Sequence, residues 1–282
     1  MGYAGLEIGL TMFATDRAVD LVTLAREAEA RGFASLYVPE HTHIPTSRST
    51  PPPTGEAELA EEYRRTLDPF VALGAAASVT SRIKLGTGIC LVAQRDPIVL
   101  AKEVASLDLL SNGRFVFGIG FGWNREEMAD HGVAFAERRG IVREKMLAMR
   151  ALWTRERAGY LGTWVRFEES WSWPKPVQRP HPPVLLGGAA GPKLFAHIAE
   201  YGDGWIPIGG AGIAASLPAF RAALDACGRD PASARIVPFG TVPNPGKLDY
   251  YASIGVREVV LRIPSASRDE VLSVLDEYAP YV

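Results

Sequence analysis

Eight short apolar segments recur along this chain, and each is followed by a segment whose apolar residues return at helical spacing. Short apolar runs bounded by Gly, Pro, Asn or Asp are typical of buried strands. The predicted strands are Leu6–Phe13, Ser35–Pro39, Ile83–Ile89, Phe115–Gly118, Val184–Gly187, Gly204–Ile208, Arg235–Thr241 and Glu258–Ile263. The predicted helices run from an N-cap at Asp16 to Arg31, and over Leu59–Val79, Pro97–Leu110, Ala136–Trp153, Pro192–Glu200, Ile213–Cys227, Leu248–Ile254 and Ser267–Glu277. This order favours a closed parallel (β/α)8 TIM barrel of the α/β class, and an open doubly wound sheet is the alternative.

Length and charge set further bounds. The chain has 282 residues, 47% of them apolar, so it can bury a large core, and we expect one domain over residues 1–282. Its net charge is only −2 and it has no run of Lys or Arg. Neither nucleic acid nor a membrane is therefore expected as a partner, and a small organic molecule is.

Cysteine usage and the amino terminus predict the compartment. Cys90 and Cys227 are too few for a disulfide framework. Residues 1–13 lack the basic start and the cleavage site of a signal peptide, and no apolar run reaches the length of a membrane span. We therefore expect a cytoplasmic protein.

Two long loops interrupt the alternation. Residues 42–58 are rich in Pro, Ser and Thr and follow the second predicted strand, at the end where barrel loops build active sites, so a lid or pocket wall is expected there. Residues 159–183 contain Trp164, Trp171 and Trp173 and predict an inserted hairpin or irregular excursion. The tryptophans suit substrate binding, packing over the barrel, or contact with a second subunit.

Glu40 and His41 end the second predicted strand, where barrel enzymes keep their working groups. A histidine titrates near neutrality and can take or give a proton, and a flanking carboxylate can raise its basicity. The competing interpretation is a histidine that only anchors the loop. His41 and His43 also have the spacing that begins the ligand set of metal-dependent hydrolases, but the other histidines do not complete such a set, so no metal site is predicted.

Glycines cluster after three later strands. The turn Gly118-Ile-Gly-Phe-Gly-Trp123 fails the dinucleotide fingerprint, because Trp123 stands where its third glycine belongs. Its glycines, Gly122 among them, let backbone approach a pocket that Trp123 fills. Residues 187–191 and 209–212 precede predicted helices and are either phosphate-binding turns or plain tight turns. Arg262, which ends the eighth strand, is a candidate for the positive charge that the second turn lacks.

Taken in order, Leu36-Tyr-Val-Pro-Glu-His41, the stretch from Ile83 to Glu127, and Gly202-Asp-Gly-Trp-Ile-Pro207 resemble the luciferase-like monooxygenase superfamily. The likeness covers about residues 6–210 and is strongest to its short oxidoreductases that use the deazaflavin coenzyme F420. It implies hydride transfer between F420 and a small organic substrate. The alternatives are an FMN-dependent two-component monooxygenase, a non-catalytic flavin-binding protein and, more remotely, a metal-dependent hydrolase.

The resemblance also implies a site. Glu40 and His41 would lie over the cofactor ring, with His41 as proton donor or acceptor, and Gly88-Ile89 would be a non-prolyl cis peptide supporting that ring. The alternative for Gly88–Cys90 is an ordinary strand end in which Cys90 is a small buried apolar residue. The implied cofactor-binding residues are Glu40, His41, Gly88, Ile89, Cys90, Gly122, Trp123, Gly187, Gly188, Ala189, Ile208, Gly209, Gly210 and Arg262.

Three further expectations complete this interpretation. Trp123 occupies the position where a sugar-phosphate-oxidising branch of the family has a carboxylic acid, which argues against that activity. Arg95 and Glu127 match the family pattern and are expected to form internal ion pairs near the rim. A homodimer is expected from the resemblance and from the tryptophans of residues 159–183.

Overall fold

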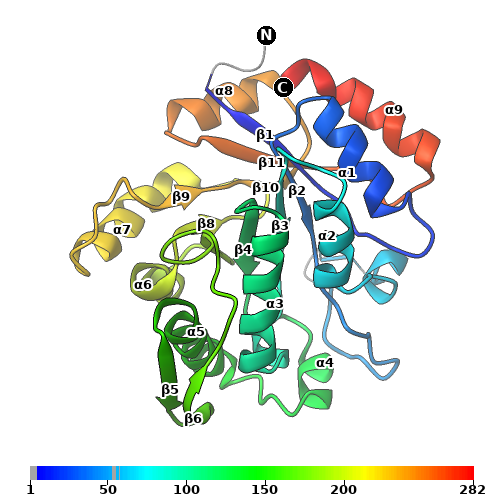
Figure 1. Ribbon diagram of the computed structural model, residues 1–282. Helices are drawn as coiled ribbons and strands as arrows, with labels where there is room; N and C mark the ends of the chain where they lie inside the picture. Colours follow the sequence, from blue (N-terminus) through cyan, green and yellow to red (C-terminus); the bar gives the residue numbers. More distant parts are fainter. Residues whose placement is uncertain (1–4, 53–54, 57) are drawn as a thin grey trace.

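Parallel strands form a ring in the computed structural model, which describes residues 5–52, 55–56 and 58–282 (Figure 1). The strands of the ring are β1 (Glu7–Thr11), β2 (Ser35–Val38), β3 (Lys84–Thr87), β4 (Phe115–Ile119), β7 (Val184–Gly187), β8 (Gly204–Ile206), β9 (Arg235–Ile236), β10 (Phe239–Thr241) and β11 (Glu258–Arg262). They follow one another around the sheet in chain order, with β11 beside β1. The predicted barrel is confirmed.

The ring closes between β8 and β10. β9 pairs with β8, β10 pairs with β11, and an isolated bridge joins Ile208 to Phe239. The segment predicted as one strand over 235–241 is therefore divided in two, but its halves share one place in the ring. Pro238 lies at the division, where it lacks the N–H that a regular strand would offer.

Helices surround the ring in Figure 1. They are α1 (Leu21–Ala30), α2 (Pro69–Ala77), α3 (Pro97–Leu110), α4 (Arg125–Asp130), α5 (Arg138–Thr154), α6 (Pro192–Tyr201), α7 (Ile213–Asp225), α8 (Pro245–Ser253) and α9 (Arg268–Tyr278), with the short 3-10 helices η1 (Glu61–Arg64), η2 (Val92–Gln94) and η3 (Ala279–Tyr281). None of the helices in the described part of the chain is long and apolar enough to span a bilayer.

Two predicted helices needed correction. Asp20, rather than Asp16, caps α1: its side chain accepts from the Thr23 N–H, while Asp16 pairs with Arg65. The helix predicted over 59–79 is two elements, η1 and α2, because Pro69 begins a new helix.

The tryptophan-rich segment that was predicted to form a hairpin or an irregular excursion forms an antiparallel hairpin. It consists of β5 (Arg157–Leu161) and β6 (Arg166–Trp171) and lies beside α5 at the edge of the molecule (Figure 1). The predicted loop over 42–58 includes residues 53, 54 and 57, which lie outside the described residues. Its remaining part, from Thr42 to Pro52, contains no regular element and extends toward α4.

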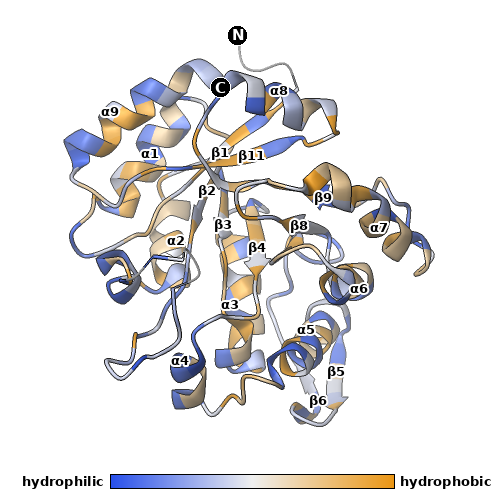
Figure 2. Ribbon diagram, turned by 180° about the vertical axis from the view of Figure 1, so that it is seen from behind, coloured by the Kyte–Doolittle hydropathy of each residue, from blue (hydrophilic) through white to orange (hydrophobic). Residues whose placement is uncertain are grey.

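Side chains fill both faces of the barrel wall. On the inside, Tyr37, Val116, Leu185, Ile206, Val237, Phe239 and Val260 pack together. On the outside, strand residues such as Phe115 and Phe117 meet the apolar sides of the helices, whose polar sides face outward (Figure 2). Because helices cover a parallel sheet, its strands are apolar on both faces, which explains the continuous apolar runs of the sequence.

Candidate active site

His41 follows β2 at the carboxyl end of the barrel and is held by groups from two other segments. Its Nδ1 lies 2.8 Å from Oε2 of Glu127 on α4, and the Thr66 hydroxyl donates to its carbonyl oxygen over 2.7 Å. The N–H of Thr42 donates to the other Glu127 oxygen at 3.3 Å. Nε2 of His41 has no hydrogen-bond partner among the described residues, so one ring nitrogen is fixed while the other has no protein partner.

Aromatic rings enclose the imidazole. The ring centroids of Tyr63 and Trp123 lie 5.3 and 5.7 Å from that of His41, and Phe13 packs on Tyr63 at 4.7 Å. Arg48, from the loop after β2, lies over Trp123 with 5.8 Å to the ring centroid. Burial raises the pKa of Tyr63, so its phenol remains protonated at neutral pH. The imidazole is therefore surrounded by aromatic rings, with 7% of its side chain exposed.

Glu40 does not pair with the adjacent histidine, contrary to the idea that this carboxylate supports His41. It is buried, its Oε2 accepts from the Leu91 N–H at 2.7 Å, and its Oε1 accepts from Arg95 Nε at 2.6 Å. Arg95 also pairs with Asp68 and Glu103. Burial alone would lower the pKa of Arg95, but the carboxylates, Glu40 first, raise it. Glu40 thus holds the segment after β3. The internal ion pairs expected for Arg95 are confirmed, whereas Glu127 hydrogen-bonds to His41.

The peptide bond Gly88-Ile89 is cis, as predicted. The Ile89 side chain lies against two glycines: a Cβ at Gly120 would come within 2.5 Å of it and one at Gly187 within 3.1 Å. Gly88 has no room for a side chain either, because a Cβ there would lie 2.3 Å from the Phe239 ring. Gly88 and Ile89 nevertheless remain partly exposed among buried neighbours, so they form apolar surface at the barrel mouth.

Cys90 is a buried apolar residue rather than a nucleophile. It is fully buried, and its N–H donates to the Gly118 carbonyl at 2.8 Å. Burial, and after it the charge of Glu40, raises the pKa of the thiol, so the reactive thiolate is disfavoured. The side chain has the role of a small core residue within the implied site.

Two glycine turns lie on the same rim. Gly187 and Gly188 end β7, and the carbonyl of Gly188 accepts from the Trp205 indole at 2.8 Å, while Ala189 beside them is exposed. Ile208 follows β8 and is 80% exposed, which is unusual for so large an apolar side chain. The rim therefore offers uncovered apolar surface near both turns.

The turn over residues 209–212 needs glycine. Gly209, Gly210 and Gly212 have φ of 71°, 79° and 75°, in the left-handed region, and the turn leads into the first residues of α7, whose N–H groups lack helical partners. The Tyr251 hydroxyl donates to the Gly209 carbonyl at 3.1 Å. An anion at this turn would meet free backbone donors.

Two cations are candidates for this turn, Arg262 as expected from the sequence and Lys247. Arg262 donates to Glu62 at 2.7 Å, so its charge is already engaged. The Lys247 amine donates to Thr241 Oγ1 at 2.5 Å and lies 5.9 Å from the centroid of the Tyr251 ring, which itself holds the turn. Sequence reasoning missed Lys247 because it sits in the first turn of α8, outside every motif, and it missed Tyr63 because that residue fell inside a predicted helix.

The two histidines after β2 contact different carboxylates of α4, His41 that of Glu127 and His43 that of Asp130. Among the described residues, no three His, Cys, Asp or Glu side chains converge to hold a metal ion. His43 hydrogen-bonds to Asp130 at 3.0 Å and to the Thr42 hydroxyl at 3.0 Å, so it points to the outer surface of α4 and away from Glu127. The described side chains therefore do not provide the set of metal ligands that a metal-dependent hydrolase needs.

The residues at the mouth fit a flat, partly apolar cofactor. Gly120 and Gly187 give the partly exposed Ile89 side chain room at the mouth, and the exposed Ile208 and the aromatic rings around His41 offer apolar contacts. The Gly209 turn with Lys247 adds a place for an anionic tail. A ring with a phosphate-bearing side chain has the matching chemistry.

Comparison with known proteins places the chain in a family. The model of the luciferase-like monooxygenase family matches residues 7–243, so the chain belongs to that family. An uncharacterized protein of Mycobacterium tuberculosis is 47% identical over 277 residues, with 97% of this chain and 98% of that protein covered.

Two other similar proteins have a named activity. An F420-dependent hydroxymycolic acid dehydrogenase of Mycobacterium tuberculosis is 30% identical over 231 residues, covering 80% of this chain and 59% of the dehydrogenase. The crystal structure of monooxygenase RslO1 from Streptomyces bottropensis superposes with a TM-score of 0.81 at 21% identity, covering 98% of both chains. The family and these relatives support an oxidoreductase, and the structural match shows that the fold is shared.

Proposed function

We propose that this chain is an F420-dependent oxidoreductase that transfers hydride between the deazaflavin and a small organic substrate. The observation that carries the proposal is the placement of His41. One ring nitrogen is held by Glu127, the other has no partner among the described residues, and aromatic rings surround the imidazole. The F420-dependent dehydrogenase that is 30% identical supports the choice of cofactor.

The proposed cofactor contacts divide into three groups. Gly88, Ile89, Gly122 and Trp123 would hold the ring; Gly187, Gly188 and Ala189 would line its side chain; and Ile208, Gly209 and Gly210 would meet its phosphate. Lys247 joins Arg262 in the third group, because its amine lies 5.9 Å from the centroid of the Tyr251 ring, which holds the turn. When bound, F420 supplies two-electron hydride chemistry and reacts poorly with oxygen.

The protein's own residues handle the proton and exclude water. A substrate carbonyl or alcohol gains or loses a proton as hydride moves, and Nε2 of His41 is the open group that can exchange it. The Glu127 carboxylate orients the ring through Nδ1 and stabilises the imidazolium that forms when Nε2 takes the proton. Tyr63 and Trp123 pack around the imidazole, while Glu40 holds Leu91 and Arg95 in the segment after β3.

The second candidate function is FMN-dependent monooxygenation, since the fold is shared with a monooxygenase. The two candidates differ in the cofactor that the protein binds more tightly. Purified apoprotein would be titrated with oxidised F420 and with FMN by fluorescence quenching. We expect F420 to bind at least about tenfold more tightly, a preference of about 1.4 kcal/mol.

Equal or reversed affinities would reject the cofactor choice. An oxygen-electrode assay with the reduced cofactor then distinguishes the reactions, because rapid substrate-dependent oxygen uptake would indicate monooxygenation. Substrate-dependent turnover that needs His41 would reject a non-catalytic flavin-binding protein.

A further inference from the structure

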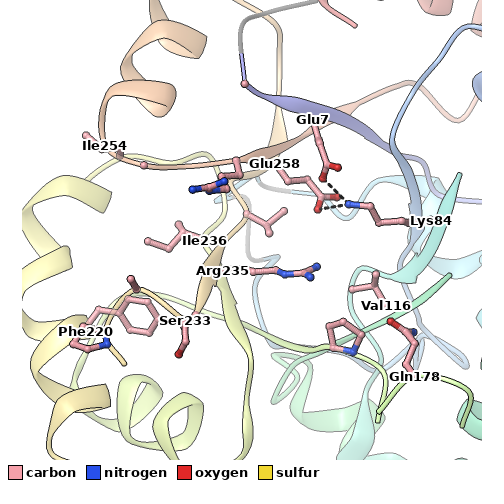
Figure 3. Close-up of a pocket in the computed structure, with 18 of the residues that line it drawn as sticks. Glu7, Lys84, Val116, Gln178, Phe220, Ser233, Arg235, Ile236, Ile254 and Glu258 are labelled. Carbon is pink, nitrogen blue, oxygen red and sulfur yellow. Dashed lines mark hydrogen bonds and ion pairs between the residues drawn. The ribbon is translucent and has the colours of Figure 1, made fainter. Parts of the chain in front are cut away.

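A cavity of about 860 Å³ opens at the amino-terminal end of the barrel (Figure 3). The first residues of several strands line it, among them Glu7 of β1, Lys84 of β3, Phe115 of β4, Arg235 of β9 and Glu258 of β11. The candidate active site lies at the opposite ends of these strands, so the two are separate. A volume of this size is typical of small-molecule sites, which occupy about 300–1,000 Å³.

The lining of this cavity, which we call the amino-end cavity, is positively charged. Five basic and two acidic side chains line it, an excess of three positive charges, whereas the whole chain carries a net charge of −2. The basic residues are Lys84, Arg114, Arg221, Arg235 and Arg257. A concave surface with such an excess concentrates anions.

Some of these charges are already engaged. The Lys84 amine lies 2.6 Å from Glu7 and 3.4 Å from Glu258, so it balances the acidic side chains (Figure 3). Glu258 also accepts from the hydroxyls of Ser35 and Tyr37, at 2.6 and 3.2 Å. The carboxylates of the cavity therefore have their donors and do not need another cation.

The Arg114 side chain also has its partners within the protein. Its guanidinium donates to the carbonyl oxygens of Ile83 and Ser111, at 2.6 and 2.8 Å, and to Thr80. It joins the start of β4 to the segment before β3.

Three arginines remain without partners. The side chains of Arg221, Arg235 and Arg257 make no hydrogen bond or ion pair with any other described residue, although each lines the cavity. Figure 3 shows Arg235 reaching into the middle of the cavity, toward Val116 and Gln178. The three arginines are exposed, and a guanidinium without a protein partner that lines a concave space can pair with a carboxylate or a phosphate.

The charge of Arg235 also reaches the barrel interior. Burial raises the pKa of Tyr37, the Glu258 carboxylate raises it further, and the positive charge of Arg235 opposes both. The positive charge of Arg235, an exposed residue, is therefore felt at the buried Tyr37 ring.

Apolar side chains form the wall next to Arg235. Phe220 of α7, Ile236 of β9 and Ile254 after α8 line the cavity on the side away from Lys84 (Figure 3). A purely inorganic anion would leave this wall uncovered, whereas an organic acid would cover it. We propose that the amino-end cavity binds a small organic anion, whose carboxylate pairs with Arg235 and whose apolar body lies along Phe220, Ile236 and Ile254.

The test uses 4-phenylbutyrate as the probe and its neutral counterpart, 4-phenylbutanol, as the ligand control. Calorimetric titration of the full chain should show saturable binding of the acid that weakens as salt rises, because the contact is an exposed charge pair. Arg235→Gln should weaken the acid at least about tenfold, the size expected for loss of one charge-assisted contact. Arg166→Gln, which removes an exposed arginine on β6, should leave the affinity unchanged.

Two further measurements locate the bound probe. Ala232→Trp, which fills the cavity from an exposed position, should abolish binding, and F420 added at saturation should not displace the probe. Circular dichroism of each variant checks the fold. The proposal is overturned by absence of binding up to about 10 mM, by equal binding of the alcohol, by an unchanged affinity in Arg235→Gln, or by competition with F420. Because no step needs F420 to bind, failure here and failure of the proposed function are distinguishable.

Discussion

Glu127 lies 2.8 Å from Nδ1 of His41, although 86 residues separate the two in the chain. Glu127 is buried on α4 and His41 follows β2, so the barrel brings together an acid and a base that no local motif joins. The contact leaves Nε2 as the one ring nitrogen of His41 without a partner among the described residues. The following two variants test this pair.

His41→Ala should lower turnover by about 10² to 10⁴, because it removes the group that exchanges the substrate proton, while F420 affinity should change little. Glu127→Gln keeps a hydrogen-bond acceptor but removes the charge, so a smaller loss of about tenfold is expected. Steady-state kinetics and F420 titration measure both effects. Glu169→Gln, on the exposed hairpin, is the control, and unchanged turnover in His41→Ala would assign His41 to anchoring the loop.

Glu40 should contribute more to the stability of the fold than to proton exchange with the substrate. Glu40→Gln removes the charge that pairs with Arg95 inside the protein, which should destabilise the fold by about 3 kcal/mol. Urea unfolding gives the free energy. Asp68→Asn is the matched control, since Asp68 pairs with the same arginine from a more exposed position and should cost less than about 1 kcal/mol. Equal losses in the two variants would contradict the buried role of Glu40.

The bounds of helices and strands were predicted best where the local capping residues and the packing of the element favour the same structure. α3 has the predicted bounds because Asp96 caps its first turn, Pro97 begins it, and Asn112 and Gly113 adopt the left-handed conformation that ends it. The strand positions also agree, since both faces of each strand are covered and the apolar runs are continuous.

Errors arose where two signals of the same kind compete. Asp16 and Asp20 are equally good caps by type, and only the contact of Asp16 with Arg65 decides between them. The six-residue helix α4 is too short to show a period. Within the site, the motif residues lie on one rim as expected, but which of Glu40, Glu126 and Glu127 meets His41 depends on tertiary contacts that local sequence does not encode.

Lys145 predicts a pH dependence of stability. Burial lowers the pKa of its amine from 10.5 to about 8, although the amine donates to the carbonyls of Ala93 and Arg95. The folded state therefore binds the proton less well than the unfolded chain. Relative to the Lys145→Met variant, the stability of the protein should rise by up to about 3 kcal/mol as pH increases from about 8 to 10.5.

Urea unfolding of the wild type and of Lys145→Met between pH 8 and 10.5 gives the difference in their free energies of unfolding. Taking the difference removes the contribution of tyrosines that titrate at high pH, because both proteins contain them. The contribution is fully present above pH 10.5 and is lost as pH falls through about 8. A difference that stays flat over the range would show that the amine keeps its usual affinity for the proton.

A homodimer remains our expectation, and the hairpin is the surface to test. Trp171 and Trp173 are 70% and 58% exposed, and burial of such rings in an interface is favourable. Sedimentation of the wild type at micromolar concentration should show a dimer, and Trp171→Ser with Trp173→Ser should shift it toward the monomer. Val71→Ser, which removes an equally exposed apolar residue on α2, is the control. A single 30.5 kDa species in the wild type would contradict the expectation.

The loop after β2 is fastened to α4 by Glu126. Its Oε1 accepts from the backbone N–H groups of Ser49 and Thr50, at 2.8 and 3.2 Å, and Oε2 accepts from the Thr50 hydroxyl at 2.6 Å. These hydrogen bonds hold Arg48 over Trp123, at the edge of the candidate active site. They also lower the pKa of Glu126 well below its ordinary 4.5, with the Thr50 hydroxyl as the largest cause and the donors of Ser49 next.

The sign of the pH effect follows from this lowered pKa. The carboxylate fastens the loop fully above pH 4.5, and the effect is lost as pH falls below that value through the pKa of the folded state. In Glu126→Gln, the amides of Ser49 and Thr50 should exchange with deuterium faster than in the wild type at neutral pH, after correction for intrinsic rates, and the two proteins should converge in strong acid. Glu168→Gln, on the exposed hairpin, should behave as the wild type. Equal protection of the two amides in wild type and Glu126→Gln would mean that the loop is held by Arg48 and Trp123 without the carboxylate.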